Sequence, residues 1–187
     1  MSVAPREGDE RYNFENDDLG FVDTESGALL KIGMSSEDVE KLIGAPRTVD
    51  RDGFRIYSGI VIKYDDNGNA SQMIVAAGNM EGDDNPNRFV SPRGVKLSTT
   101  LDEFKSVYGD EYNEPSQAAE GDESIKSSAM MAVRYYAKNG DTFNYLGGSY
   151  TKENKPENDA DLIMQTFLFS TETKTVSVMS VGNGTAN

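Results

Sequence analysis

The feature that most constrains this chain is an internal repeat. Residues 31–44 (KIGMSSEDVEKLIG) align without gaps on residues 96–109 (KLSTTLDEFKSVYG). In each copy a hydroxyl residue, Ser35 or Thr100, stands three positions before an acidic residue, which is the spacing of a helix capping box. Apolar residues then recur at i, i+3 and i+4, and a glycine follows, so each copy predicts a short amphipathic helix. A helix of about two turns is not stable alone in water, so each helix must lie on a sheet.

The β-rich runs that follow each helix also match. Residues 61–68 (VIKYDDNG) align on residues 133–140 (VRYYAKNG), and both end in Asn-Gly, the strongest short signal for a hairpin turn. Further β-rich runs occupy 72–77, 142–146, 162–169 and 175–181. The chain therefore predicts an α+β fold of two tandem repeats. Each repeat is a short helix packed on an antiparallel β-meander, and the two sheets can join into one curved sheet.

Charge and composition divide the chain into repeats and connecting segments. Residues 1–27 hold eight acids and two bases, which predicts an acidic flexible tail or tether with a short edge strand near its end. Repeat 1 is expected over 28–78, a linker over 79–92 and repeat 2 over 93–187. Within repeat 2, the acidic stretch 110–128 predicts a solvated insertion.

Composition excludes several classes of function. The 187 residues include 32 acidic and 18 basic side chains, a net charge of −14, and neither histidine nor cysteine. The acidic charge of the chain opposes binding to nucleic acid, because such binding needs basic side chains that replace the counterions of the phosphates. Without imidazole or thiol there is no Ser-His-Asp or Cys-His pair, and zinc, copper and haem lose their usual ligands. We expect no catalytic residue, no metal, no cofactor and, since no apolar run approaches about 18 residues, no transmembrane segment.

One motif begins like a calcium loop. Residues 65–69 (DDNGN) match its first ligand positions, but Ala70 stands where a glycine is required and Ala76 where a glutamate is required. The segment therefore predicts a hairpin turn.

The run 162–169 (LIMQTFLF) is apolar on both faces of the strand that it predicts. One face holds Leu162, Met164, Thr166 and Leu168, and the other holds Ile163, Gln165, Phe167 and Phe169. A helix covers only one face of such a sheet. We predict that the aromatic face is open and binds a partner protein through Tyr64, Tyr136, Tyr145, Phe167 and Phe169. Coverage of that face by the insertion, by the tail or by a second subunit is the alternative.

Residues 32–46 (IGMSSEDVEKLIGAP) and 91–109 (SPRGVKLSTTLDEFKSVYG) carry a resemblance to a known group. They resemble the tandem-repeat secreted proteins and lipoproteins of Gram-positive bacteria that are built like the β-lactamase inhibitor protein (BLIP). The single helix-plus-meander unit is also similar to that of BamE, a small outer-membrane assembly lipoprotein. The resemblance implies a secreted protein or cell-surface lipoprotein, with a signal ahead of Met1 and residues 1–27 as the tether. It also implies protein binding rather than catalysis.

We therefore expect a non-enzymatic extracytoplasmic module that binds another extracytoplasmic protein, with inhibition of a secreted hydrolase as one form of this activity. The acidic loops 79–87 and 110–123 would steer a basic partner. One alternative is a self-associating cell-envelope structural protein, in which a homodimer buries the same aromatic residues. A carboxylate-dependent enzyme acting on wall polysaccharide is the less favoured alternative.

Overall fold

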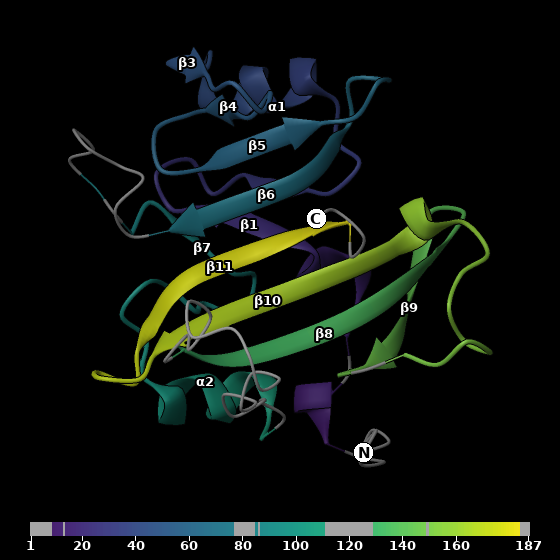
Figure 1. The fold of residues 1–187 in the computed structure, drawn as a ribbon. Coiled ribbons are helices and arrows are strands. Elements are labelled where there is room, and N and C mark those ends of the chain that lie inside the picture. The colour runs from purple at the N-terminus through teal and green to yellow at the C-terminus, as the bar shows by residue number, and fades with distance from the viewer. Residues whose placement is uncertain are drawn as a thin grey trace, which may run out of the picture.

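The computed structural model describes residues 9–12, 14–76, 85, 87–110, 129–148 and 150–183, and its strands form two antiparallel sheets (Figure 1). The larger sheet has the strand order β3-β4-β5-β6-β11-β10-β8-β9. These strands are β3 (Thr48–Val49), β4 (Arg55–Ile56), β5 (Val61–Tyr64), β6 (Ala70–Ala76), β8 (Ala129–Asn139), β9 (Thr142–Gly147), β10 (Leu162–Ser170) and β11 (Val176–Asn183). The smaller sheet lies behind the larger one in Figure 1, with the order β2-β1-β7. Its strands are β1 (Gly20–Asp23), β2 (Leu29–Lys31) and β7 (Phe89–Val90).

Both predicted helices are present, as α1 (Ser36–Ile43) and α2 (Leu101–Tyr108). The Ser35 hydroxyl accepts a backbone hydrogen bond at the start of α1. At the start of α2, Thr100 and Glu103 form the reciprocal bonds of a capping box, 2.9 and 3.2 Å long. Each helix ends at a glycine with positive φ, a conformation that favours glycine. Three single-turn 3₁₀ helices complete the described elements: η1 (Glu10–Tyr12), η2 (Asn16–Asp18) and η4 (Asp159–Asp161).

The predicted α+β architecture of two helix-on-meander repeats is wrong. The chain is mostly β, and one sheet of eight strands joins both halves through the pairing of β6 with β11. In the second half β10 pairs with β8 rather than with β9, so β8 to β11 do not follow a meander. The repeat in the sequence encodes helix caps and turns, which are local. Strand partners are decided by long-range packing, which the repeat does not encode.

The described part of the segment predicted as a tether over 1–27, residues 9–12 and 14–27, belongs to the fold. β1 is the central strand of the smaller sheet rather than an edge strand, and Leu19 and Phe21 are buried. Asp23 is fully buried and accepts two hydrogen bonds of 2.9 Å from the Arg88 guanidinium, which holds the pKa of Asp23 below its ordinary value of 3.8. The predicted linker 79–92 likewise contributes β7 to this sheet. Residues 1–8, 77–84 and 111–128, the last forming most of the predicted insertion, lie outside the described residues.

The core lies on one face of the larger sheet, which we call the inner face. Because side chains alternate along a strand, β10 directs Ile163, Gln165, Phe167 and Phe169 to this side. α2 packs Phe104 and Tyr108 against Phe167, with ring centroids 4.9 and 5.0 Å apart. The aromatic face of β10 is therefore the face that the helix covers.

Three arginines bind the C-terminal end of α2. Carbonyl groups in the last turn of a helix lack intrahelical donors and carry the negative end of its dipole. Guanidinium groups donate to three carbonyl oxygens of this turn: Arg11 to Lys105 O (3.2 Å), which also accepts the Gly109 backbone N–H (2.9 Å), Arg93 to Val107 O (3.0 Å) and Arg134 to Tyr108 O (2.6 Å). Arg93 also pairs with the buried Asp18, with Nε 2.8 Å from Oδ1 and one Nη 3.1 Å from Oδ2. These contacts join α2 to the sheet and to the N-terminal segment.

We predict that Arg93→Met lowers the free energy of unfolding by about 3 kcal/mol, because Asp18 keeps a buried charge that has lost its partner. Urea denaturation followed by circular dichroism measures the loss. Arg47→Met, which replaces an exposed arginine, serves as the control and should change stability by less than about 0.5 kcal/mol. Equal effects of the two substitutions would contradict the role given to Arg93.

Candidate protein-binding surface

The five aromatic residues predicted to bind a partner point into the protein. Tyr136, Phe167 and Phe169 are at most 1 % exposed, and Tyr64 and Tyr145 are partly buried against the same core. The prediction that they form an open face is therefore wrong. Their face is the inner face, covered by α2, by the N-terminal segment and by the smaller sheet.

Part of this cover comes from the segment predicted as a tether. The ring of Phe14 lies 4.5 Å from that of Tyr145 and 6.1 Å from that of Tyr136, measured between centroids. The Tyr136 hydroxyl donates to Gln165 Oε1 at 3.4 Å, and Gln165 donates to the Asp18 carbonyl at 3.0 Å. Burial raises the pKa of Tyr136 well above its ordinary value of 10.0. These groups hold the interior together and are not accessible to a partner.

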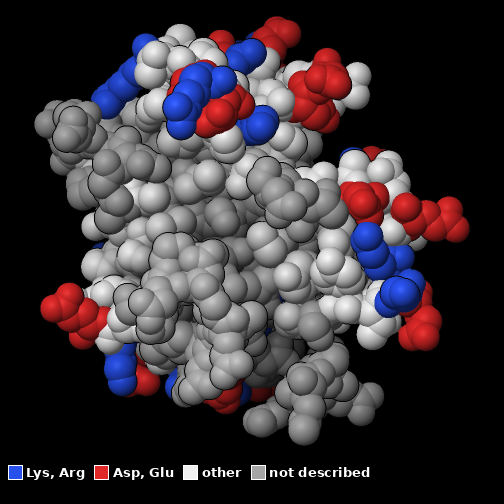
Figure 2. All heavy atoms as spheres, in the orientation of Figure 1, with Lys and Arg blue, Asp and Glu red and all other residues white. Residues whose placement is uncertain are grey.

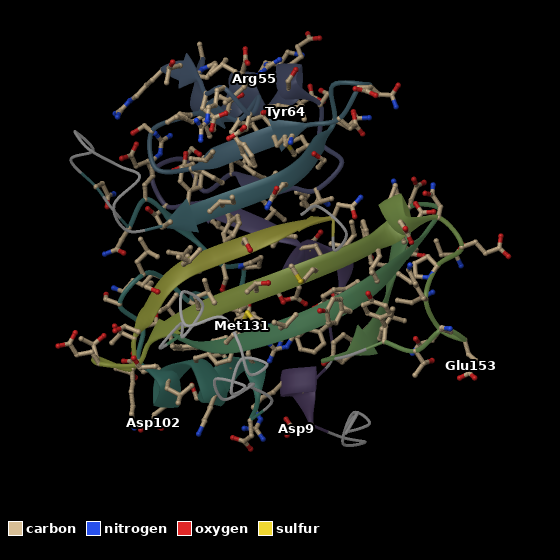
Figure 3. The ribbon with its side chains drawn as sticks, viewed as in Figure 1. Asp9, Arg55, Tyr64, Asp102, Met131 and Glu153 are labelled. Carbon is tan, nitrogen blue, oxygen red and sulfur yellow. The ribbon has the colours of Figure 1, made fainter. Side chains whose placement is uncertain are left out.

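Tyr64 belongs to a separate polar cluster beside α1 (Figure 3). Its hydroxyl lies 2.9 Å from that of Tyr57, and the Arg55 guanidinium lies 4.8 Å from the centre of its ring. Arg55 also pairs with Glu40 of α1 at 2.8 Å. Burial raises the pKa of Tyr64. This cluster connects β4 and β5 to α1.

We call the opposite face of the larger sheet the outer face. The pairing of β6, β11, β10 and β8 aligns their side chains on this face in rows, and these rows contain no charged side chain. Residues paired directly across antiparallel strands point to the same side. The pairing gives three rows: Ala76, Val178, Leu168 and Met131; Ile74, Ser180, Thr166 and Val133; and Gln72, Gly182, Met164 and Tyr135. We call the first of these the apolar row. The charged side chains that are visible in Figure 2 lie at the top, at the right and at the lower left of this side of the molecule.

The outer face is distinct from the core. Val133 and Thr166 are buried, at 5 and 7 % exposure, yet neither belongs to the core cluster. The Thr166 hydroxyl is buried and makes no hydrogen bond within the described part of the chain. In the apolar row, Leu168 and Val178 are half-buried and Met131 is 36 % exposed. The uncharged side chains of this face thus lie outside the core cluster, and Met131 is the most exposed of those in the apolar row.

Acidic sequence adjoins the apolar row on both sides. β6 ends at Ala76 in this row, and the chain continues into 77–84, which holds three acids. β8 begins at Ala129, two residues before Met131, directly after the acidic stretch 110–128. The loops predicted to steer a partner, 79–87 and 110–123, lie largely outside the described residues, so their steering role stays a prediction.

Residues 65–69 form the predicted turn. Asp65 Oδ1 accepts hydrogen bonds from the backbone N–H groups of Asn67 and Asn69, both 2.9 Å long. Across the described ranges, no group of three or more Asp, Glu, His or Cys side chains gathers where it could hold a metal ion. No helix in the described part of the chain is long and apolar enough to span a membrane.

Comparison with protein-family models finds no match, and comparison with curated proteins finds none. A solved structure that matches is the crystal structure of a DUF4309 family protein, YjgB, from the Gram-positive bacterium Bacillus subtilis. It is 13 % identical, the match covers 80 % of this chain and 78 % of that chain, and the TM-score is 0.41. A likeness this distant does not place the chain in that family. Neither BLIP nor BamE is among these findings, so that resemblance stays a prediction.

Sequence reasoning assigned the two faces of β10 the wrong way round and did not single out Met131 or Val178. The signal available was the absence of charge at alternate positions of four strands, although the chain is 27 % charged. That signal becomes visible only when the strand order brings those positions into rows.

We predict that Phe167→Ala lowers the free energy of unfolding by about 3–5 kcal/mol, because it leaves a cavity under α2. Met131→Ser removes a partly exposed side chain of the outer face and should cost less than about 1 kcal/mol. Thermal and urea unfolding of both variants measure the difference. A Phe167→Ala protein as stable as Met131→Ser would contradict the assignment of the faces.

Proposed function

We propose that this protein is a non-enzymatic module that binds another extracytoplasmic protein on the outer face of its larger sheet. The observation that carries the proposal is the apolar row, in which Met131 and its neighbours stand on an uncharged face of a chain with net charge −14. Contiguous apolar surface bordered by polar residues is typical of protein-binding sites. An exposed methionine adapts its shape to a partner surface.

The partner that fits this face presents an apolar surface bordered by basic side chains. The acidic charge of the module attracts positive charge and raises the rate of association. A second copy of the chain carries the same charge of −14 and is repelled. Charge complementarity therefore favours a different, basic protein over a homodimer, which is the structural alternative.

The extracytoplasmic location and an inhibitor-like activity are supported by the sequence resemblance to the BLIP-like secreted proteins and lipoproteins. On this basis the partner is sought in the envelope and in the secreted fraction.

The proposal predicts that a photo-crosslinking side chain placed at position 131 captures a partner from these fractions of the source organism. The captured protein is then purified and its affinity for the full chain is measured. We expect Met131→Asp to weaken this affinity at least tenfold, because it places a charge in the apolar row. Rising salt should slow association, because it screens the acidic charge.

Val49→Asp is the matched control, since Val49 is 56 % exposed on the terminal strand β3. It adds the same charge and should leave the affinity unchanged. Equal binding by the wild type and Met131→Asp would overturn the proposal. Crosslinking at position 131 only to a second copy, with concentration-dependent dimerisation, would replace it with the self-associating alternative.

A further inference from the structure

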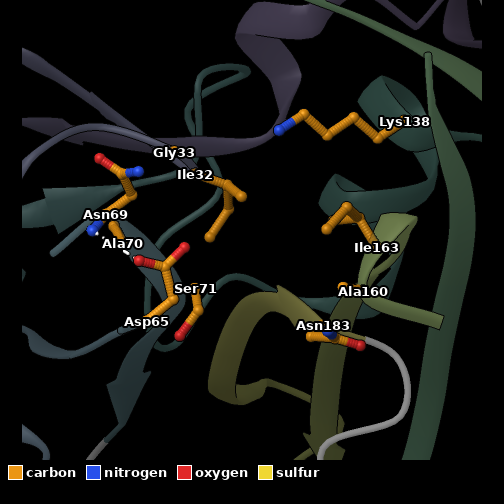
Figure 4. Close-up of a pocket in the computed structure, with 10 residues that line it drawn as sticks. All are labelled: Ile32, Gly33, Asp65, Asn69, Ala70, Ser71, Lys138, Ala160, Ile163 and Asn183. Carbon is orange, nitrogen blue, oxygen red and sulfur yellow. Dashed lines mark hydrogen bonds between the residues drawn. The ribbon is translucent and has the colours of Figure 1, made fainter. Parts of the chain in front are cut away.

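The larger sheet splits between β6 and β11 at the end opposite the apolar row. Their pairing stops at Gln72 and Gly182. Beyond that pair, the backbone of Ala70 instead exchanges hydrogen bonds of 2.8 Å with residues 33–34. Asn183 remains paired with β10. The diverging strands leave a pocket of about 180 Å³ between the two halves of the chain (Figure 4).

Polar side chains from both halves line this pocket. Asp65, Asn69 and Ser71 come from the first half, and Lys138 and Asn183 come from the second. Together they supply a carboxylate, two amides, a hydroxyl and an ammonium group. The Ser71 hydroxyl already donates to the Lys63 carbonyl at 3.2 Å. Polar groups on the walls of a pocket are typical of a site for a small polar ligand.

The two charged groups of the pocket have opposite signs and do not pair with each other. Asp65 uses Oδ1 for the two backbone hydrogen bonds of its turn, which leaves Oδ2 outside those bonds. Lys138 Nζ makes no hydrogen bond or ion pair with any residue that the structure describes. The two side chains come from opposite walls of the pocket (Figure 4). A ligand carrying both charges would complement both walls at once.

Size and apolar lining narrow the class of ligand. The pocket is smaller than the roughly 300–1,000 Å³ of sites for drug-sized molecules. Ile32 and Ile163 add apolar surface beside the polar groups. A short molecule with an ammonium at one end, a carboxylate at the other and a few carbon atoms between them meets these conditions.

We propose that this pocket binds a small zwitterion, an amino acid or a dipeptide, with its ammonium on Asp65 and its carboxylate on Lys138. The pocket is separate from the apolar row, so this proposal does not rest on the proposed function.

Titration of the full chain with glycylglycine, followed by NMR chemical shifts, tests the proposal. We expect saturable shifts at the pocket with a Kd of about 1 mM, an affinity reasonable for so small a ligand. N-acetylglycine lacks the ammonium and glycinamide lacks the carboxylate, so each should bind at least tenfold more weakly.

Two charge-removing variants complete the test. Asp65→Asn keeps an oxygen for the turn and removes the charge, and Lys138→Met keeps most of the length of the side chain and removes the charge; each should weaken glycylglycine binding at least tenfold. Asp66→Asn and Lys96→Met remove the same charges from exposed positions that do not line the pocket, and both should bind as the wild type does. Absence of saturable shifts at ten times the expected Kd, or equal binding by all four variants, would overturn the proposal.

Discussion

The position of α2 on the larger sheet is the constraint on which the rest of the structure depends. β10 is apolar on both faces, so its hydrophobicity alone does not decide which side the helix covers. Arg93 and Arg134 donate to the last carbonyls of α2 and hold it over Phe167 and Phe169. Arg134 is fully buried and lies within 5.5 Å of the ring centres of Phe14, Phe104 and Tyr108, where cation–π attraction offsets part of its desolvation. Because α2 covers the inner face of the larger sheet, the opposite face is left as the outer face.

The N-terminal segment is held by the same contacts. Asp18 pairs with Arg93, and the Asp18 carbonyl accepts a hydrogen bond from Gln165 on the inner face. Phe14 packs on Tyr145 at the far end of that face. Acidic residues that would be expected in a solvated tail therefore serve as ion-pair partners. This explains how a strongly charged segment contributes the central strand of the smaller sheet.

The parts of the fold that depend on neighbouring residues could be predicted from the sequence. The cap at Thr100 and the turn at Asp65 follow from side chains that bond backbone groups within four residues. The strand order could not be predicted, because the hairpin signals identify turns between neighbouring strands and carry no information on the pairing of β10 with β8. The role of Arg93 could not be predicted either, because nothing in the neighbouring sequence places Asp18 beside it. The aromatic face was wrongly predicted to be open, because aromatic content does not distinguish a core from an exposed patch.

Methionine oxidation tests the central claim most directly, because Met131 is partly exposed on the outer face while Met73 and Met179 are fully buried on the inner face. Dilute hydrogen peroxide oxidises methionine according to its exposure, and tandem mass spectrometry reads each position separately. We expect Met131 to be oxidised at least about tenfold faster than Met73 and Met179 in the folded protein, and the three rates to become equal in urea. Oxidation of Met73 or Met179 at the rate of Met131 without denaturant would show that the faces of the larger sheet are assigned incorrectly.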